Sequence, residues 1–212
     1  DDKVSVLGNG NYDFTLGFRN AFSYKNLSMS VLVDMKFGAD VYSMSKMQSH
    51  VNGTSKETLE GREGWYASEQ ARLSANVDAK DWTPTGGYVG KGVKAVTDAD
   101  GNVSYVPNDV YVDPAKYWQA LQNSSPEPFI CDNSFVKLRE VSLSYSCPKK
   151  WFVHTPIESV TLSAYGRNLL LIYSKVDNID PESSYNNGNG QGFEYGSLPS
   201  RRTFGFGINV KF

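Results

Sequence analysis

The sequence lacks long apolar runs, since the longest one, Leu169 to Tyr173, has only five residues. A membrane-spanning helix needs about 20 consecutive apolar residues, so no such helix is expected. The first residues, Asp1 to Val4, carry neither a signal peptide nor a transit pattern. This leaves two alternatives, a cytoplasmic protein or a targeting segment that lies upstream of Asp1.

The chain also contains nearly equal numbers of acidic and basic residues, and it contains little cysteine. It carries 21 Lys and Arg against 23 Asp and Glu, a net charge of -2. Without an overall basic field, a nucleic-acid partner is not expected. The two cysteines, Cys131 and Cys147, are too few for a disulfide scaffold and lack the C-x-x-C spacing of zinc or redox sites.

Aromatic residues are abundant by comparison. Phe, Trp and Tyr make up 13% of the chain, although its mean hydropathy of -0.43 is polar. Because long apolar runs are missing, these aromatics must be spaced singly among polar residues. Such spacing is typical of strands with one apolar face and one polar face.

Alternation of apolar and polar residues predicts five long strands. In the last segment, for example, Phe204 and Phe206 alternate with Gly205 and Gly207. The expected strands are longer than the usual five or six residues. They are predicted at residues 12–23, 27–40, 134–146, 159–171 and 202–212.

The two long connections, 44–132 and 174–200, lack this alternation. Residues 58–75 have the composition of a helix or of two helices interrupted near Gly61 and Gly64. A hairpin is expected about Asp100-Gly101, where a turn sequence occurs. Asp113 and Pro114 fit the N-cap and first position of a short helix that extends to Gln122.

The strand lengths and the connections favour a membrane barrel. A tilted transmembrane strand needs about 9 to 11 residues, and outer-membrane barrels combine short periplasmic turns with long extracellular loops. We therefore expect an all-β fold with small helices in a long loop, an antiparallel segment of a transmembrane β-barrel. Residues 44–132 and 174–200 would be extracellular loops. A soluble antiparallel sheet with one packed face is the alternative.

The strand assignment also separates the two cysteines. Cys131 and Cys147 lie at opposite ends of one expected strand, on the order of 50 Å apart at about 3.4 Å per residue. A disulfide allows only about 7 Å between Cα atoms. We predict that no disulfide joins them.

Several sequence blocks, in a fixed order, carry a family resemblance. They are NSFVKLREVSLSYS at 133–146, GRNL at 166–169, IDPE at 179–182 and GFEYGSLPSRRTFGFGINVKF at 192–212. The likeness extends back through YVDPAKYW at 111–118, LEGREGWY at 59–66 and GNGNYDFTLGFRNAFSYKNLSMSV at 8–31. These blocks resemble the carboxy-terminal end of SusC/RagA-type TonB-dependent outer-membrane transporters, over essentially the whole chain.

The resemblance implies a larger protein and a transport function. Members of the family are plugged barrels of about 22 strands, so residues 1–212 would be the C-terminal portion, about five strands. The implied location is the bacterial outer membrane, crossed several times. The implied activity is import of oligosaccharides or peptides together with a SusD-like surface lipoprotein. Energy would come from TonB through an N-terminal plug that this sequence does not include.

The last strand carries a candidate signal for the barrel-assembly machinery, because it has an outward apolar row that ends in an aromatic. Packing against outer-membrane lipid is the compatible alternative. The residues of this row are Phe204, Phe206, Ile208, Val210 and Phe212.

Two further sets of residues are candidates for contacts. Loop aromatics could bind cargo or the lipoprotein, or pack the loops onto each other; they are Tyr88, Tyr105, Trp118, Tyr185, Phe193 and Tyr195. Charged residues of the polar rows would face the lumen, where structural pairing, across strands or with a plug, is preferred over contact with cargo; they are Arg19, Asp34, Lys36 and Arg167.

No pattern in the sequence indicates catalysis, a metal or a cofactor. Asp177, Asp180 and Glu182 lack the spacing of a calcium loop, so a solvated turn is expected there. His50 and His154 lie in different connections, which gives neither a metal pair nor a catalytic triad. An enzyme is therefore not expected. The alternative to a transporter is a soluble secreted carbohydrate-binding β-domain whose aromatic rows form its core.

Overall fold

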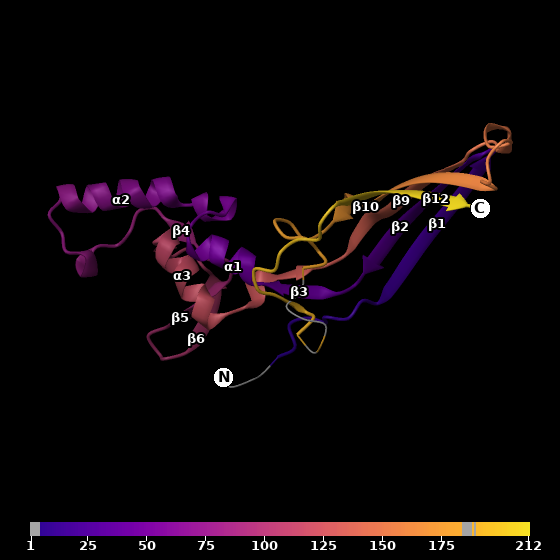
Figure 1. Ribbon diagram of the computed structural model, residues 1–212. Helices are drawn as coiled ribbons and strands as arrows, with labels where there is room; N and C mark the ends of the chain where they lie inside the picture. The colour runs from indigo at the N-terminus through magenta and orange to yellow at the C-terminus, as the bar shows by residue number, and fades with distance from the viewer. Residues whose placement is uncertain (1–4, 184–187, 189) are drawn as a thin grey trace. The chain divides into compact units, whose positions relative to one another are not determined.

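The computed structural model of the chain describes residues 5–183, 188 and 190–212 (Figure 1). The chain divides into two compact units, one made of the residues up to 44 together with 130–212 and the other of residues 45–129. Within the described residues, no helix is long and apolar enough to cross a membrane.

A five-stranded antiparallel sheet dominates the first unit, in the order β1-β2-β9-β10-β12. The expected fold class, mostly strands with small helices, is confirmed. The sheet does not close on itself, because β1 and β12 are its two edges. Its strands are β1 (Phe14–Tyr24), β2 (Leu27–Phe37), β9 (Phe135–Ser146), β10 (Ser159–Ser174) and β12 (Thr203–Lys211).

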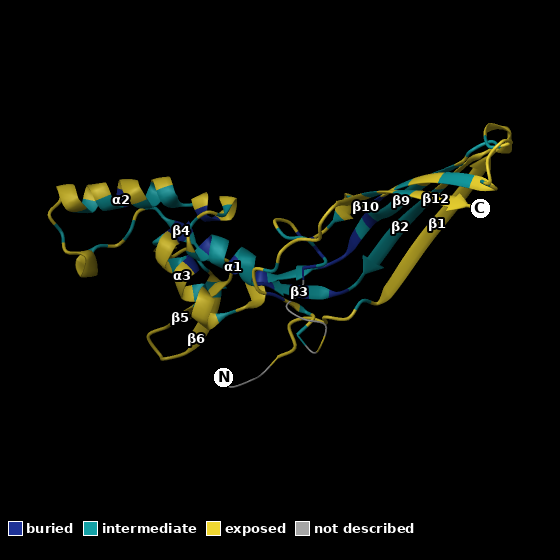
Figure 2. Cartoon of the chain, viewed as in Figure 1, coloured by how far each residue is buried: buried dark blue, intermediate teal, exposed yellow. Residues whose placement is uncertain are grey.

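The register of the sheet brings the apolar rows onto one face. Phe18 lies opposite Val33 in the β1–β2 pair, and Leu162 lies opposite Ile208 in the β10–β12 pair. This face is not covered by the described residues, and the side chain of Phe206 is 87% exposed. Figure 2 shows β1 exposed along its whole length. The aromatic rows are therefore not the core of the chain.

A β-bulge interrupts this alternation in the middle of the sheet. Leu32 pairs with Glu140 but the next residue, Val33, pairs with Leu138, so Arg139 is an extra residue in β9. The β9–β10 pairing shifts at the same place, between Arg167 and Leu170. A bulge re-aims the side chains beside it, and here Arg139 and Glu140 both contact charged partners on the polar face.

A smaller, three-stranded sheet completes the first unit. It consists of β11 (Phe193–Glu194), β3 (Asp40–Ser43) and β8 (Ile130–Asp132), in that order. Glu194 is 1% exposed and accepts a hydrogen bond from Ser43 Oγ at 2.9 Å. A 3₁₀ helix, η4 (Lys149–Trp151), lies between β9 and β10.

The second unit contains three α-helices and two small hairpin-like sheets. Asp113 caps α3 as expected, because its Oδ1 accepts a hydrogen bond from the backbone N–H of Ala115 at 2.9 Å. The expected hairpin is present as β5 and β6, with Gly101 in the turn at φ 85°. The helices are α1 (Met44–Val51), α2 (Arg62–Ser74) and α3 (Pro114–Ser124), and the strands are β4 (Tyr88–Val89), β5 (Val93–Thr97), β6 (Val103–Pro107) and β7 (Tyr111–Val112).

Short 3₁₀ helices connect these elements: η1 (Lys56–Leu59), η2 (Ala79–Asp81) and η3 (Glu127–Phe129). The expected break near Gly61 is present, since this residue has φ 78° between η1 and α2. The expected break at Gly64 is wrong, because this residue lies inside α2. A single glycine lowers helix stability by only about 1 kcal/mol, which the rest of the helix outweighs.

Candidate functional site

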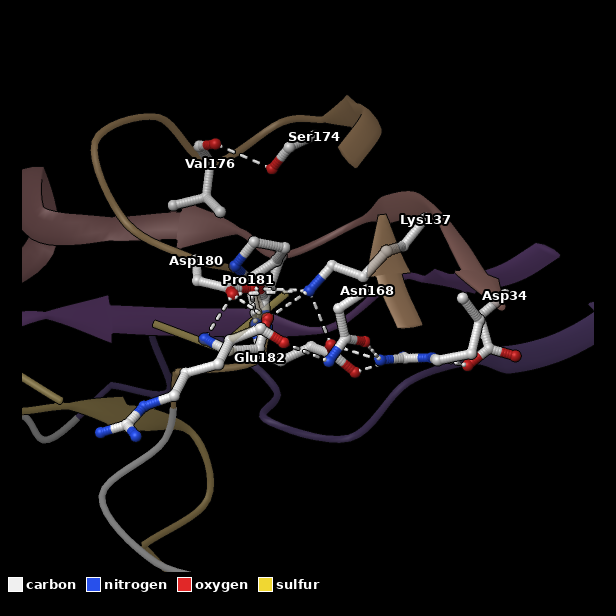
Figure 3. A network of polar contacts seen from close by, with 12 residues as sticks. Asp34, Lys137, Asn168, Ser174, Val176, Asp180, Pro181 and Glu182 are labelled. Atoms are coloured by element: carbon white, nitrogen blue, oxygen red, sulfur yellow. Dashed lines mark hydrogen bonds and ion pairs between the residues drawn. The ribbon is translucent and has the colours of Figure 1, made fainter. Parts of the chain in front are cut away.

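The best-defined polar cluster lies on the polar face of the large sheet, where the segment after β10 folds back against it. Figure 3 shows the side chains of Lys137, Asp180 and Glu182 converging. Lys137 and Arg139 come from β9, and the two carboxylates come from the connection between β10 and β12. Two parts of the chain more than forty residues apart thus meet here.

Lys137 is almost fully buried, with 4% of its side chain exposed. Its Nζ donates to Glu182 Oε2 at 2.7 Å, to Ser200 Oγ at 2.8 Å and to Asp180 Oδ1 at 3.1 Å. An ammonium group has three N–H donors, and all three are used. A buried charge is tolerated when it is paired and hydrogen-bonded in this way.

Arg139 joins the same cluster to the strands on either side of β9. Its Nε donates to Asp34 Oδ2 of β2 at 2.8 Å, and its Nη1 donates to Asn168 Oδ1 of β10 at 2.7 Å. Nη1 and Nη2 also form a two-bond contact with Glu182, at 2.8 and 2.5 Å. Such forked arginine–carboxylate pairs are stronger and more directional than single hydrogen bonds.

The environment lowers the pKa of both carboxyl groups. Burial alone would raise the pKa of Glu182, but its hydrogen bonds to Arg139 and Lys137 outweigh burial and hold the pKa below its ordinary value. Burial opposes ionisation of Asp180 as well, and hydrogen bonds from Ser200 and from the backbone of Glu182 lower its pKa. Both groups are therefore ionised at neutral pH, where they pair with the two cations and do not exchange protons.

Further hydrogen bonds hold the backbone of this segment. Asn133 Nδ2 donates to the carbonyl of Pro181 at 2.9 Å and to the hydroxyl of Tyr12 at 2.9 Å. Burial, together with the charge of Glu182, raises the pKa of Tyr12 to about 12. The Asp180–Pro181–Glu182 turn is thus held through side chains and main chain alike.

The expectation of a solvated turn at Asp180 and Glu182 is therefore wrong. The two cations of β9 remove these carboxylates from water, which their sequence spacing gave no means to foresee. The described residues contain no group of three or more His, Cys, Asp or Glu side chains able to hold a metal. The signal that sequence reasoning missed is the consecutive pair Arg139-Glu140, which breaks the alternation and marks the bulge.

Three of the four charged residues expected in the lumen have partners. Asp34 pairs with Arg139 at 2.8 Å, and Arg167 pairs with Glu140 at 2.7 Å. Lys36 lies over the ring of Tyr12, 5.3 Å from its centroid. The fourth, Arg19, is exposed on β1.

The loop aromatics fall into two groups. Tyr88 and Trp118 are each only 6% exposed and pack against each other with ring centroids 5.7 Å apart, which favours the loop-packing alternative for these two residues. Tyr105 is 71% exposed and remains accessible. Phe193 and Tyr195 are about half exposed, and their rings contact that of Tyr42 edge-on and at a tilt respectively, while Tyr185 lies outside the described residues.

The apolar row of β12 is exposed, and no disulfide links the two cysteines. The exposed fractions are 66% for Phe204, 87% for Phe206, 73% for Ile208, 39% for Val210 and 77% for Phe212. Cys131 and Cys147 are not joined by a disulfide bond in the structure.

No family model matches the chain, but curated proteins and solved structures do. TonB-dependent receptor P26 of Formosa agariphila is 30% identical over 217 residues, which cover 100% of this chain and 18% of that protein. TonB-dependent receptor P3 of the same organism is 27% identical, and the alignment covers 98% of this chain and 17% of that protein. The chain thus spans less than a fifth of the length of the curated relatives that it matches.

Solved structures of a peptide importer have the same fold. The RagAB importer in its closed-closed state aligns with a TM-score of 0.59 and 17% identity. The alignment covers 98% of this chain and 18% of the importer chain. The open-open state aligns with a TM-score of 0.52 and 18% identity, and the alignment covers 93% of this chain and 17% of the importer chain.

The fold is thus that of a wall segment from a TonB-dependent barrel transporter. Similarity along this whole chain to part of two TonB-dependent receptors agrees with this class. The resemblance to SusC/RagA-type TonB-dependent transporters that the sequence blocks carry is confirmed along the whole chain.

Proposed function

We propose that this chain forms the C-terminal portion of the barrel wall in an outer-membrane TonB-dependent transporter. The observation that carries the proposal is the continuous exposed apolar face of five strands, with Phe204 and Phe206 at one edge and Phe18 at the other. Outer-membrane barrels present such a face to lipid and a polar face to the lumen. Lipid would cover the apolar face of the sheet that the described residues leave exposed.

The rest of the proposal concerns the whole transporter. Residues 44–132 and 174–200 are its extracellular loops, and TonB supplies energy through an N-terminal plug. The cargo is oligosaccharide or peptide, taken up together with a SusD-like lipoprotein. The barrel-assembly machinery inserts the protein, which crosses the membrane several times and is not an enzyme. Support comes from the names of the relatives, two TonB-dependent receptors and a peptide importer.

The soluble carbohydrate-binding domain is the weaker alternative. In such a domain the aromatic rows would be a core covered by a second layer. The exposed fractions of Phe206 and Ile208, 87% and 73%, speak against it. Five strands with an uncovered apolar face would aggregate in water.

Fractionation and uptake of the full-length protein test the proposal. The protein should sediment with the outer membrane and require detergent for extraction. Cells that lack it should lose uptake of a labelled oligosaccharide or peptide pool, and cells that lack TonB should show the same loss. A monodisperse full-length protein that is extracted without detergent would contradict the proposal.

A further inference from the structure

The second unit contains a cavity that the barrel wall does not account for. Its volume is about 400 Å³, within the range of small-ligand sites, and it lies between the end of α1, the start of α2 and the start of α3. Aromatic side chains line one part of it, Trp65 and Tyr66 among them. Tyr66 is 69% exposed, so solvent reaches the cavity on this side.

Arg62 is the cationic residue that lines the cavity, and its position is fixed. Its Nε donates to the carbonyl of Thr58 at 2.7 Å, and its Nη2 donates to Thr58 Oγ1 at 2.7 Å and to the carbonyl of Gly53 at 2.8 Å. These bonds immobilise the guanidinium before any ligand arrives. Preorganisation of this kind reduces the cost of binding.

The same geometry leaves one side of the guanidinium unused. Within the described residues, Nη1 of Arg62 has no hydrogen-bond partner and Arg62 makes no ion pair. All of its hydrogen-bond acceptors are neutral oxygens, so the guanidinium is not paired with a carboxylate among the described residues. The acidic residue among those that line the cavity, Asp113, caps α3 through its Oδ1.

We infer that this cavity binds a carboxylate-bearing ligand, with the Arg62 Nη1 group holding the carboxylate and Trp65 and Tyr66 contacting the attached apolar part. A charge-assisted hydrogen bond from arginine is about twice as strong as a neutral one, which favours a carboxylate over a hydroxyl. The start of α3 adds the partial positive charge of a helix N-terminus, partly offset by Asp113. A free peptide carboxylate and a uronic acid both provide this group. As a statement about cargo, the inference rests on the proposed transport function; as a statement about binding, it does not.

Calorimetric titration of the detergent-solubilised full-length protein tests the inference. The probes are acetyl-diglycine, its C-terminal amide, glucuronate and glucose. At least one of the two carboxylates should bind tenfold or more tightly than its neutral counterpart, and the pair that shows the difference identifies the source of the group. Equal binding within both pairs, or no saturable binding of either carboxylate, would overturn the inference.

Variants locate the site. Arg62→Gln should remove the tenfold preference, whereas Lys116→Gln, which removes an exposed charge of α3 that does not line the cavity, should keep it. Because Arg62 also holds backbone carbonyls, Tyr66→Ala serves as the second variant: it should weaken carboxylate binding several-fold while circular dichroism stays unchanged. Retention of the preference in Arg62→Gln, together with unchanged carboxylate affinity in Tyr66→Ala, would place binding elsewhere. Carboxylate binding without import would reject only the transport proposal, and import without carboxylate binding would reject only this site.

Discussion

Arg139 and Glu182 are joined by two hydrogen bonds, 2.8 Å from Nη1 and 2.5 Å from Nη2, across 43 residues of sequence. The pair fastens the segment after β10 to the polar face of β9. The forked geometry fixes direction as well as distance, because both nitrogens must face both oxygens. Lys137 contacts the same carboxylate at 2.7 Å, so Glu182 balances two cations.

Replacement of Glu182 by Gln should loosen this segment. The change removes the charge that faces Lys137 and Arg139, and hydrogen bonds to charged groups contribute about 1.5–3 kcal/mol each. Limited proteolysis of the full-length protein within residues 174–200 should become several-fold faster. Glu140→Gln is the matched control: its partner Arg167 is 59% exposed, so a loss below about 1 kcal/mol is expected. Equal cleavage rates in the two variants would show that the cluster does not hold the segment.

The same attachment should depend on pH in one direction. The pKa values of Asp180 and Glu182 are held below their ordinary values, so their contribution to stability is complete above the ordinary carboxyl range, about pH 4, and is lost as the pH falls through the lowered values. Hydrogen-exchange protection factors of residues 174–183, which correct for the pH dependence of the intrinsic exchange rate, should stay high from pH 7 to pH 5 and fall only in stronger acid. Loosening between pH 7 and pH 6 would point to other groups.

The lipid-facing assignment of the apolar row predicts a contrast between neighbouring positions on β12. Ile208→Arg places a charge on the apolar face, where arginine costs about 2–4 kcal/mol near the membrane midplane. Asn209→Arg places the same charge one residue away, on the polar face. The first variant should lower the yield of full-length protein in the outer membrane, and the second should not. Similar yields would argue against lipid on this face.

The proposed assembly signal can be separated from simple packing at Phe212. Deletion of Phe212 should reduce the amount of assembled full-length protein several-fold, whereas Lys211→Ala, a change beside it on the polar row, should leave assembly unchanged. The readout is heat-modifiable migration of the barrel from the membrane fraction. Unchanged assembly after the deletion would restrict Phe212 to lipid contact.

Burial predicts opposite behaviour for two loop aromatics. Trp118 is 6% exposed and its ring lies 4.6 Å from that of His50, so Trp118→Ala should cost about 3–5 kcal/mol in the stability of the second unit. Tyr105 is 71% exposed, so Tyr105→Ala should change stability by no more than about 0.5 kcal/mol. Co-purification of the proposed SusD-like lipoprotein should fall for Tyr105→Ala, and unchanged recovery would exclude contact through this ring.

Strand positions, helix α3 and the β5–β6 hairpin follow from the sequence alone, because their signals are local. Alternation of residues such as Phe204 and Gly205 has the period of a strand, and Asp113-Pro114 has the chemistry of a helix start. The two rows of each strand likewise predicted which residues share a face.

Only the tertiary structure decided which charges meet. Lys137 and Arg139 lie far in sequence from Asp180 and Glu182. Their pairing depends on a bulge, marked only by the break in alternation at Arg139-Glu140, and on the return of the segment after β10, which no periodic pattern marks. It likewise decided which aromatics are buried, because no local sequence signal distinguishes the buried ring of Trp118 from the exposed ring of Tyr105. Local sequence patterns determine on which face of a strand a residue lies, whereas long-range packing determines which residues it contacts.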